Sequence, residues 1–426
     1  MTRRLRVEQT QRGTRLVVGV GALWLADVGL AAGLDAVGVR FSSAVAGMLL
    51  VFGALLAFER VRPGACTHLD AWFQPAYDFL GRWMALFFVP PLALVHTNHL
   101  GTLGDIAKVA LVLMVGYVFT VVSTAYLAKG LARDASVEAE NSMSPQPILR
   151  LSEQSLLVVW LLVLAGSGGL LAATGWIGFQ VALLTAVAVA AFIGGSLGRA
   201  AIEQRLRGVL RNALLAIVHP VVVSAAAVGG FLSLGPLPIS AYQAVEGWSA
   251  YAVLMAFLNP SVWALGFRLY HERVRLKRHA VTVVVSLSAA AMLAMVSSAV
   301  LARVLGLGPL LSKALIPRTV TTPIAIPIAE VLGGEPGLTA AFVIITGVLG
   351  ALIGVTILNA LGLRDPTSRG LAMGASAGGI GTAALVAREP AAAALSGIGF
   401  ALLATFSALF ISIAPIREFV LWLVGL

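Results

Sequence analysis

The sequence is poor in charged residues and almost free of cysteine, and each shortage narrows the class of protein. Charged residues make up 11% of the 426 residues, whereas a soluble domain carries about 25%. The single cysteine, Cys66, excludes an intramolecular disulfide and a cysteine-rich metal site. Because 59% of the residues are hydrophobic, the composition predicts an all-α polytopic membrane protein.

Motifs for cofactors, metals and covalent chemistry are also lacking. The glycines of residues 375–381 (ASAGGIG) do not follow a strand and do not match a dinucleotide-binding loop. No residue set has zinc or calcium spacing, and no nucleophile–base or paired-carboxylate arrangement stands out. The net charge of +10 falls mostly between apolar spans, as the positive-inside rule requires, and no basic run with interleaved aromatic residues occurs. We therefore expect no enzyme activity, no cofactor, no metal and no nucleic-acid partner.

Long apolar runs recur along the whole chain. A membrane helix needs about 20 mostly apolar residues, and this rule predicts about 12 transmembrane segments. Eleven continuous spans lie near 16–34, 42–58, 77–95, 106–128, 154–173, 178–198, 212–233, 248–269, 280–304, 338–361 and 392–414, and two broken segments lie near 313–333 and 369–388. The Lys and Arg residues place the N-terminus and the loop near residue 60 in the cytoplasm. The N-terminus is basic and runs into a full-length span, which predicts a retained first helix.

A polar, proline-containing stretch at residues 130–153 separates two apolar parts. Its composition is typical of a linker, with an ordinary cytoplasmic loop as the alternative. We therefore predict a four-helix membrane scaffold at 1–130, a linker with one connecting helix at 131–177, and a transport domain at 178–426. The small residues of the first part suit helix packing in lipid and a homodimer contact.

Two segments near the C-terminus, 313–334 and 369–390, are interrupted where a membrane helix should be continuous. Prolines remove backbone donors from the first and glycines loosen the second. The interrupting residues are Pro317, Pro323, Pro327, Gly374, Gly378, Gly379 and Gly381. In lipid, freed backbone groups need partners inside the protein or in a water-filled cavity. Paired interruptions indicate a transporter binding site, although glycine and proline are also simply common in membrane helices.

A weak internal repeat accompanies these breaks. Asn259-Pro260 and Thr322-Pro323 are each followed by an apolar helix and then by LGL, at 305–307 and 361–363. Repeats with breaks in corresponding positions recur in secondary transporters. The repeats are inverted or parallel depending on whether 313–333 crosses fully or is re-entrant, and the sequence leaves both open.

If the two broken segments face each other, their helix N-termini favour an anion. Hydroxyl donors, glycines that permit close approach and one arginine would complete this site. The candidate substrate-binding residues are Asn259, Arg318, Thr319, Thr321, Thr322, Ser376, Gly379, Gly381 and Thr382. The alternatives are an interfacial arginine at position 318 and a helix-packing asparagine at position 259.

A coupling ion, H⁺ or Na⁺, would need an intramembrane carboxylate or histidine. The candidates in the second half are Glu330, Glu335, Asp365, Glu389 and His219. Three of them also have a structural interpretation: a helix end for Glu330, a surface pair with its neighbour for Glu389, and a packed histidine for His219.

Several motifs resemble the LrgB (CidB) family, among them PRTVTTPIA at 317–325, LRDPTSRG at 363–370 and GTAALVAREP at 381–390. The first half, with FLGRWMALFFVPPLALV at 79–95, resembles the LrgA (CidA) partner. A fusion in this order is similar to the plastidal glycolate/glycerate translocators of plants. The resemblance implies transport of small 2-hydroxy or 2-oxo monocarboxylates such as glycolate, glycerate or pyruvate. It also carries an older holin-like role in murein hydrolase export and cell lysis.

The sequence departs from that family at two positions. The family often has a histidine where Gly378 stands, and many bacterial members have a glutamate near Pro327. A proton role at these positions therefore does not carry over to this chain.

Together these observations predict a secondary transporter of small organic monocarboxylates that works by alternating access, one bundle rocking or sliding (an elevator) against the other. The alternative is a holin-like protein that permeabilises the membrane, and a third hypothesis is a sensor without flux. We expect a homodimer in the bacterial plasma membrane, with the plastid inner envelope as the alternative location.

Overall fold

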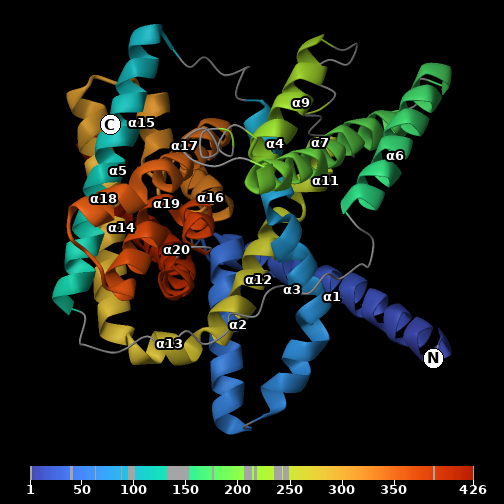
Figure 1. Ribbon diagram of the computed structural model, residues 1–426, viewed down its shortest axis with the longest axis horizontal. Coiled ribbons are helices and arrows are strands. Elements are labelled where there is room, and N and C mark those ends of the chain that lie inside the picture. Colours follow the sequence, from blue (N-terminus) through green and yellow to red (C-terminus); the bar gives the residue numbers. More distant parts are fainter. Residues whose placement is uncertain are drawn as a thin grey trace. The chain divides into compact units, whose positions relative to one another are not determined.

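The protein is helical throughout the part of the chain that the structure describes. The computed structural model describes residues 2–38, 42–62, 64–87, 89–94, 101–131, 153–174, 177–205, 214, 218–234, 242, 249–386 and 389–425. These ranges contain helices joined by turns, and no strand occurs within them. Nine of the described helices are long and apolar enough to cross a membrane. The predicted all-α membrane fold is therefore confirmed (Figure 1).

The chain divides into two compact units, and each contains residues from distant parts of the sequence. The first unit combines Met1–Tyr77, His99–Ser144 and Val262–Leu426, and the second combines Asp78–Asn98 with Pro145–Ser261. The first unit holds α1 (Thr2–Val37), α2 (Ser43–Val61), α5 (Leu103–Leu131), α13 (Arg273–Arg278), α14 (Ala280–Val304), α15 (Pro309–Leu315), α16 (Thr322–Leu332), α17 (Pro336–Leu349), the π-helix η2 (Gly350–Gly354), α18 (Val355–Ala360), α19 (Pro366–Val386), α20 (Pro390–Ser412) and α21 (Ala414–Leu423). The second holds α4 (Val89–Ala93), α6 (Glu153–Thr174), α7 (Ile177–Arg205), α9 (Pro220–Leu234) and α11 (Ala250–Met255). Helices α3 (Ala65–Phe87) and α12 (Leu258–His271) contribute to both.

The third predicted span, 77–95, differs from the structure. Helix α3 begins at Ala65 and α4 follows it as a separate short helix. The first half of α3 is amphipathic, with Cys66 and Ala76 buried but His68 exposed, so an unbroken apolar run does not mark it. Most of the predicted linker, and part of the predicted span at 212–233, lie outside the described residues.

Each of the two segments predicted to be interrupted near the C-terminus contains one break, whereas α16 (Thr322–Leu332) continues through Pro327, which was expected to interrupt it. Helix α15 ends at Leu315 and α16 begins only at Thr322. Helix α19 is broken at Gly378, whose φ of 57° and ψ of −147° are far from helical values. A positive φ of this kind is accessible to glycine at little cost. A third break, at residues 256–257, separates α11 from α12, and Asn259 is the second residue of α12.

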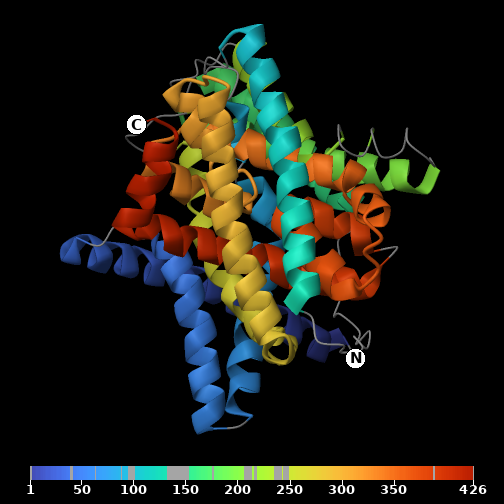
Figure 2. The same ribbon diagram turned by 90° about the vertical axis from the view of Figure 1, so that its left-hand side faces the viewer.

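Helix α5 packs with one face against α14 and α19 of the first unit (Figure 2). Its residues Tyr117, Val121 and Ala125 are buried in a cluster that also contains Leu358 and Met373. Such van der Waals packing is what holds helices together in lipid, where burial from water provides little driving force between them. The fold thus places a helix from the first third of the chain against both broken segments.

Candidate functional site

The centre of the candidate site is Arg318, which lies in the break between α15 and α16. The chain leaves the helix here because Pro317 and Pro323 flank it, and its backbone continues through tight turns. The Arg318 N–H donates to Leu315 O at 3.2 Å, and the Val320 N–H donates to Pro317 O at 2.9 Å. The Arg318 side chain is 0% exposed. A guanidinium has therefore been placed in the interior of a membrane protein, where a charge is costly.

Two hydroxyl groups accept hydrogen bonds from the Arg318 guanidinium. Its Nε donates to Ser298 Oγ at 2.8 Å, and its Nη2 donates to Thr120 Oγ1 at 3.3 Å. Both hydroxyls donate their own protons to backbone carbonyls, those of Ala294 and Gly116. They are therefore neutral acceptors and leave the positive charge uncompensated.

The third nitrogen of Arg318 has no such partner. Nη1 is buried and makes no hydrogen bond within the described part of the chain. Ion pairs in the described part of the chain include Lys108–Asp105, His271–Asp70 and Arg369–Glu389, and Arg318 is in none of these three. A buried cation without a counter-charge is the arrangement expected where a ligand supplies the missing anion.

Helix α5 makes room for this guanidinium at Gly116. A Cβ atom at that position would lie 2.5 Å from Nη2 and 2.8 Å from Cζ of Arg318. No side chain fits at such distances unless the guanidinium moves. Gly116 and Thr120 lie one helical turn apart, so one face of α5 forms this side of the arginine site.

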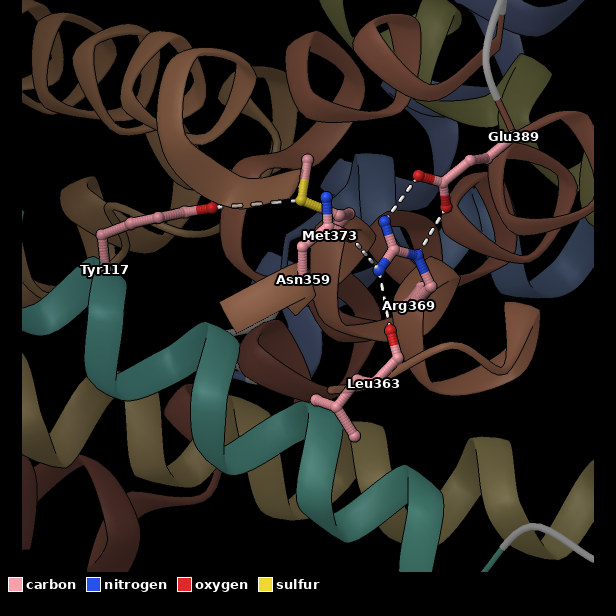
Figure 3. Close-up of polar contacts among 6 residues, drawn as sticks. All are labelled: Tyr117, Asn359, Leu363, Arg369, Met373 and Glu389. Carbon is pink, nitrogen blue, oxygen red and sulfur yellow. Dashed lines mark hydrogen bonds and ion pairs between the residues drawn. The ribbon is translucent and has the colours of Figure 1, made fainter. Parts of the chain in front are cut away.

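The neighbouring residue on α5, Tyr117, contacts the second broken segment. Its hydroxyl points at Met373 Sδ of α19, 4.0 Å away (Figure 3), and lies close to Ser376. Gly354 of η2 lies beside this contact, since an added Cβ there would be 2.4 Å from the hydroxyl and 2.5 Å from Met373 Sδ. One turn of α5, residues 116–120, therefore touches both segments that the sequence marks as broken.

A second buried arginine, Arg369, provides a contrast. Its Nε and Nη2 bind the two oxygens of Glu389, at 2.6 and 2.5 Å. Its Nη1 donates to Asn359 Oδ1 at 2.9 Å and to Leu363 O at 2.7 Å (Figure 3). This cluster ties the start of α19 to the start of α20 and to the turn after α18. Arg369 is neutralised and fully bonded, whereas Arg318 is neither.

The other predicted site residues on the first broken segment are close to Arg318 in sequence and mostly buried. Thr319 and Thr322 are 4% and 5% exposed. Thr321 precedes the first residue of α16 and its side chain makes no capping hydrogen bond. Backbone N–H groups and the positive end of the α16 dipole therefore face this break.

The predicted residues on the second broken segment form their own contacts. Ser376 is buried and donates to Ala372 O. Thr382 donates to Gly378 O across the break and also pairs with Ser396 Oγ at 2.7 Å. Gly381 is buried against Ala377, whereas Gly379 is exposed with open space around it.

The remaining predicted residue, Asn259, belongs to the second compact unit at the start of α12. Its part in a common site with Arg318 stays a prediction.

The acidic coupling candidates have structural roles. Glu335 accepts hydrogen bonds from the N–H groups of Gly337 and Leu338 and caps α17. Asp365 caps α19 in the same way, Glu389 pairs with Arg369, and Glu330 is exposed near the end of α16. The helix end expected for Glu330 agrees with the structure, whereas Glu389 pairs with Arg369 of α19 and not with its sequence neighbour as expected. His219 Nδ1 is buried and makes no hydrogen bond to a described residue.

The sequence prediction missed the α5 residues and one buried carboxylate. Asp27, 6% exposed in the middle of α1, accepts a hydrogen bond from Trp263 Nε1 at 2.9 Å. The signal on α5 was a small and polar face formed by Gly116, Thr120 and Thr124 at intervals of four residues. Within the described ranges, no group of three or more His, Cys, Asp or Glu residues is placed to hold a metal ion.

Comparison with known proteins divides the chain into two family segments. A model described as the LrgA family matches residues 33–128, and one described as the LrgB-like family matches residues 204–416. The turn of α5 at the site lies in the first match, whereas Arg318, Ser298 and Ser376 lie in the second. No solved structure matches the chain.

Individual relatives carry transport and holin-like names. The chain is 30% identical to plastidal glycolate/glycerate translocator 1 of Arabidopsis thaliana, over 97% of this chain and 81% of that protein. It is 27% identical to the antiholin-like protein LrgB of Bacillus subtilis, over 43% of this chain and 79% of that protein. It is 28% identical to the holin-like protein CidB of Staphylococcus epidermidis, over 37% of this chain and 68% of that protein.

Proposed function

The chain belongs to the LrgA/LrgB family of membrane proteins, and on that premise we propose that it is a secondary transporter of small organic monocarboxylates. Glycolate, glycerate and pyruvate represent the substrate class. The observation that carries this proposal is the buried, uncompensated guanidinium of Arg318. The plant relative that matches nearly the whole chain, named as a glycolate/glycerate translocator, supports the same substrate class.

The hydrogen bonds of Arg318 determine how a carboxylate would bind. Ser298 and Thr120 occupy the edge of the guanidinium formed by Nε and Nη2. The end formed by Nη1 and the second proton of Nη2 is left for the substrate. Two parallel N–H groups match the two oxygens of a carboxylate, and such bidentate pairs are short and strong. The hydroxyls of Thr319 and Thr322 and the N-terminus of α16 supply further donors at this break.

Substrate binding requires an opening step, because Arg318 is 0% exposed in this conformation. Alternating access of the site to the two sides of the membrane would provide it. The coupling ion, H⁺ or Na⁺, and a homodimeric assembly belong to the proposal as expectations. The antiholin-like and holin-like names of the bacterial relatives support the alternative function, in which the protein modulates murein hydrolase export and cell lysis rather than carrying a substrate.

The test is uptake of labelled glycolate by proteoliposomes that contain the purified full chain. We expect saturable uptake that glycerate and pyruvate suppress and that excludes a neutral sugar. Arg318→Lys keeps the charge but loses the two parallel N–H groups of the guanidinium. We expect uptake efficiency to fall at least tenfold, which corresponds to about 1.4 kcal/mol of binding free energy. Thr322→Ala and Thr382→Ala should also reduce uptake.

The matched control is Arg303→Lys. Arg303 lies on α14, as Ser298 does, but is exposed and donates to Trp422 O, so uptake should stay within twofold of wild type. Equal flux of glycolate and sugar, unaffected by Arg318→Lys, would reject the carrier and favour the holin-like alternative.

A further inference from the structure

Helix α5 belongs to the part of the chain that matches the LrgA family, yet it contacts the arginine of the LrgB-like part. Gly116 and Thr120 both touch the Arg318 guanidinium. Tyr117, between them, contacts Met373 and Gly354 beside the second break. The matched LrgB-like segment, 204–416, supplies only one of the two acceptors found for the guanidinium, Ser298.

We propose that this turn of α5 is part of the substrate site, with Thr120 as a positioning residue and Gly116 as the residue that sets the space around the guanidinium. The proposal rests on the proposed function, because it concerns how Arg318 meets a carboxylate. It gives the N-terminal part a role in substrate recognition beyond that of a scaffold.

Thr120 fixes which edge of the guanidinium is available. Its hydroxyl donates to Gly116 O at 2.8 Å, so towards Arg318 Nη2 its oxygen can act only as an acceptor. With Ser298 accepting from Nε, the plane of the guanidinium is held at two points on one edge. The free end is then directed away from both acceptors. Without Thr120 the group is held at one point only, and the loss appears as weaker substrate binding.

Gly116 fixes the position of the guanidinium along α5. A methyl group there would approach Nη2, Cζ and Nε to 2.5, 2.8 and 3.0 Å, so Arg318 would have to move from its acceptors. The neighbouring atoms are the charged end of a side chain that is itself hydrogen-bonded, and displacement would cost those bonds. A longer substrate tolerates such a shift less well than a shorter one, so selectivity between glycolate and glycerate should change.

Two matched controls exist on the same helix. An added Cβ at Gly130 meets nothing within 4 Å, so Gly130→Ala repeats the chemical change in open space. Thr124 is buried and donates to Thr120 O at 2.7 Å, so Thr124→Val removes the same kind of backbone hydrogen bond one turn further along. Thr120→Ser keeps the accepting hydroxyl and tests for rescue.

The experiment measures KM and maximal rate of glycolate uptake, with glycerate as competitor, for Gly116→Ala, Thr120→Val, Thr120→Ser and the two controls in proteoliposomes. We expect Gly116→Ala and Thr120→Val to raise KM about tenfold. Gly116→Ala should also alter the selectivity between glycolate and glycerate. Thr120→Ser and both controls should keep a KM within twofold of wild type.

The outcomes separate this proposal from the function it rests on. If wild type shows no saturable uptake, the proposed function fails. If wild type transports and Arg318→Lys does not, but Gly116→Ala and Thr120→Val keep the wild-type KM, the role of α5 is refuted while the function stands. Loss of folded protein in Gly116→Ala leaves the decision to the Thr120→Val and Thr120→Ser pair, whose KM values must differ if the hydroxyl positions Arg318.

Discussion

A buried arginine that serves a ligand should be dispensable for stability, and Arg318→Met tests this. The substitution removes two hydrogen bonds but also removes a charge that the described residues do not compensate. Ser298 and Thr120 keep their own donors bonded to backbone carbonyls, so neither hydroxyl proton is orphaned. Replacing buried ionic groups with apolar side chains of similar volume is often neutral or stabilising by ~1–4 kcal/mol. We therefore expect Arg318→Met without substrate to be as stable as wild type or more stable.

The chain carries its own probe for this measurement. Cys66 is the single cysteine and is 1% exposed, so a thiol-reactive dye reports its exposure as the protein unfolds on heating. Cys66→Ser gives the background signal. With glycolate at about 100 times its Kd, the free energy of unfolding of wild type should increase by ~2.7 kcal/mol. Glycolate should not stabilise Arg318→Met, since the guanidinium that would bind its carboxylate is gone.

Two results would contradict this reasoning. If the free energy of unfolding of Arg318→Met without substrate were more than ~2 kcal/mol below that of wild type, the arginine would be a structural residue whose loss breaks a buried network. If Arg318→Met were stabilised by glycolate as wild type is, the carboxylate would bind elsewhere.

Two further predictions concern stability. Glu389→Gln leaves the buried Arg369 without its carboxylate and should lower the free energy of unfolding by ~3 kcal/mol. This is the low end for a broken buried pair, because Glu389 is 25% exposed. In a double-mutant cycle with Arg369→Gln, effects that add within ~0.5 kcal/mol would show that the two side chains are not coupled. At Gly374 an added Cβ would lie 2.3 Å from Ser396 O, so Gly374→Ala should force α19 and α20 apart and lower the melting temperature. An added Cβ at Gly397 meets nothing within 4 Å, so Gly397→Ala should leave the melting temperature unchanged. Equal melting temperatures for the two variants would refute the close packing at Gly374.

The sequence predicted the helical membrane fold and the positions of the breaks because both have local causes. Apolar length marks a spanning helix, and Pro317 and Gly378 lie where a helix ends or kinks. Position decides the effect, since Pro323 lies in the first turn of α16 and Pro327 inside that helix. The start of α3 at Ala65 was missed because an amphipathic helix carries no continuous apolar run. The π-helix η2 was missed because Gly350–Gly354 forms within an otherwise regular apolar stretch.

The site was only partly predictable because its central contacts are not local. Arg318 was identified as a candidate from its place in the break, with an interfacial position as the alternative, and its complete burial excludes that alternative. Thr120, which accepts from it, is 198 residues away in sequence. A glycine and a threonine are ordinary residues in a membrane helix. Their spacing shows that they share a face, and only the structure shows what that face contacts.

The contact of α5 with Arg318 also bears on how the site would open. Arg318 is held more closely by Ser298, at 2.8 Å, than by Thr120, at 3.3 Å, and shorter hydrogen bonds of this kind are the stronger ones. Ser298 lies on α14, which leads directly into α15 and the break, whereas Thr120 lies on a separate segment of the chain. Of the two hydrogen bonds that hold the guanidinium, the one to α5 is therefore the weaker. Opening would break the hydrogen bond to Thr120 while Arg318 and Ser298 stay together, and closure of α5 around a bound carboxylate would restore that bond and complete the site.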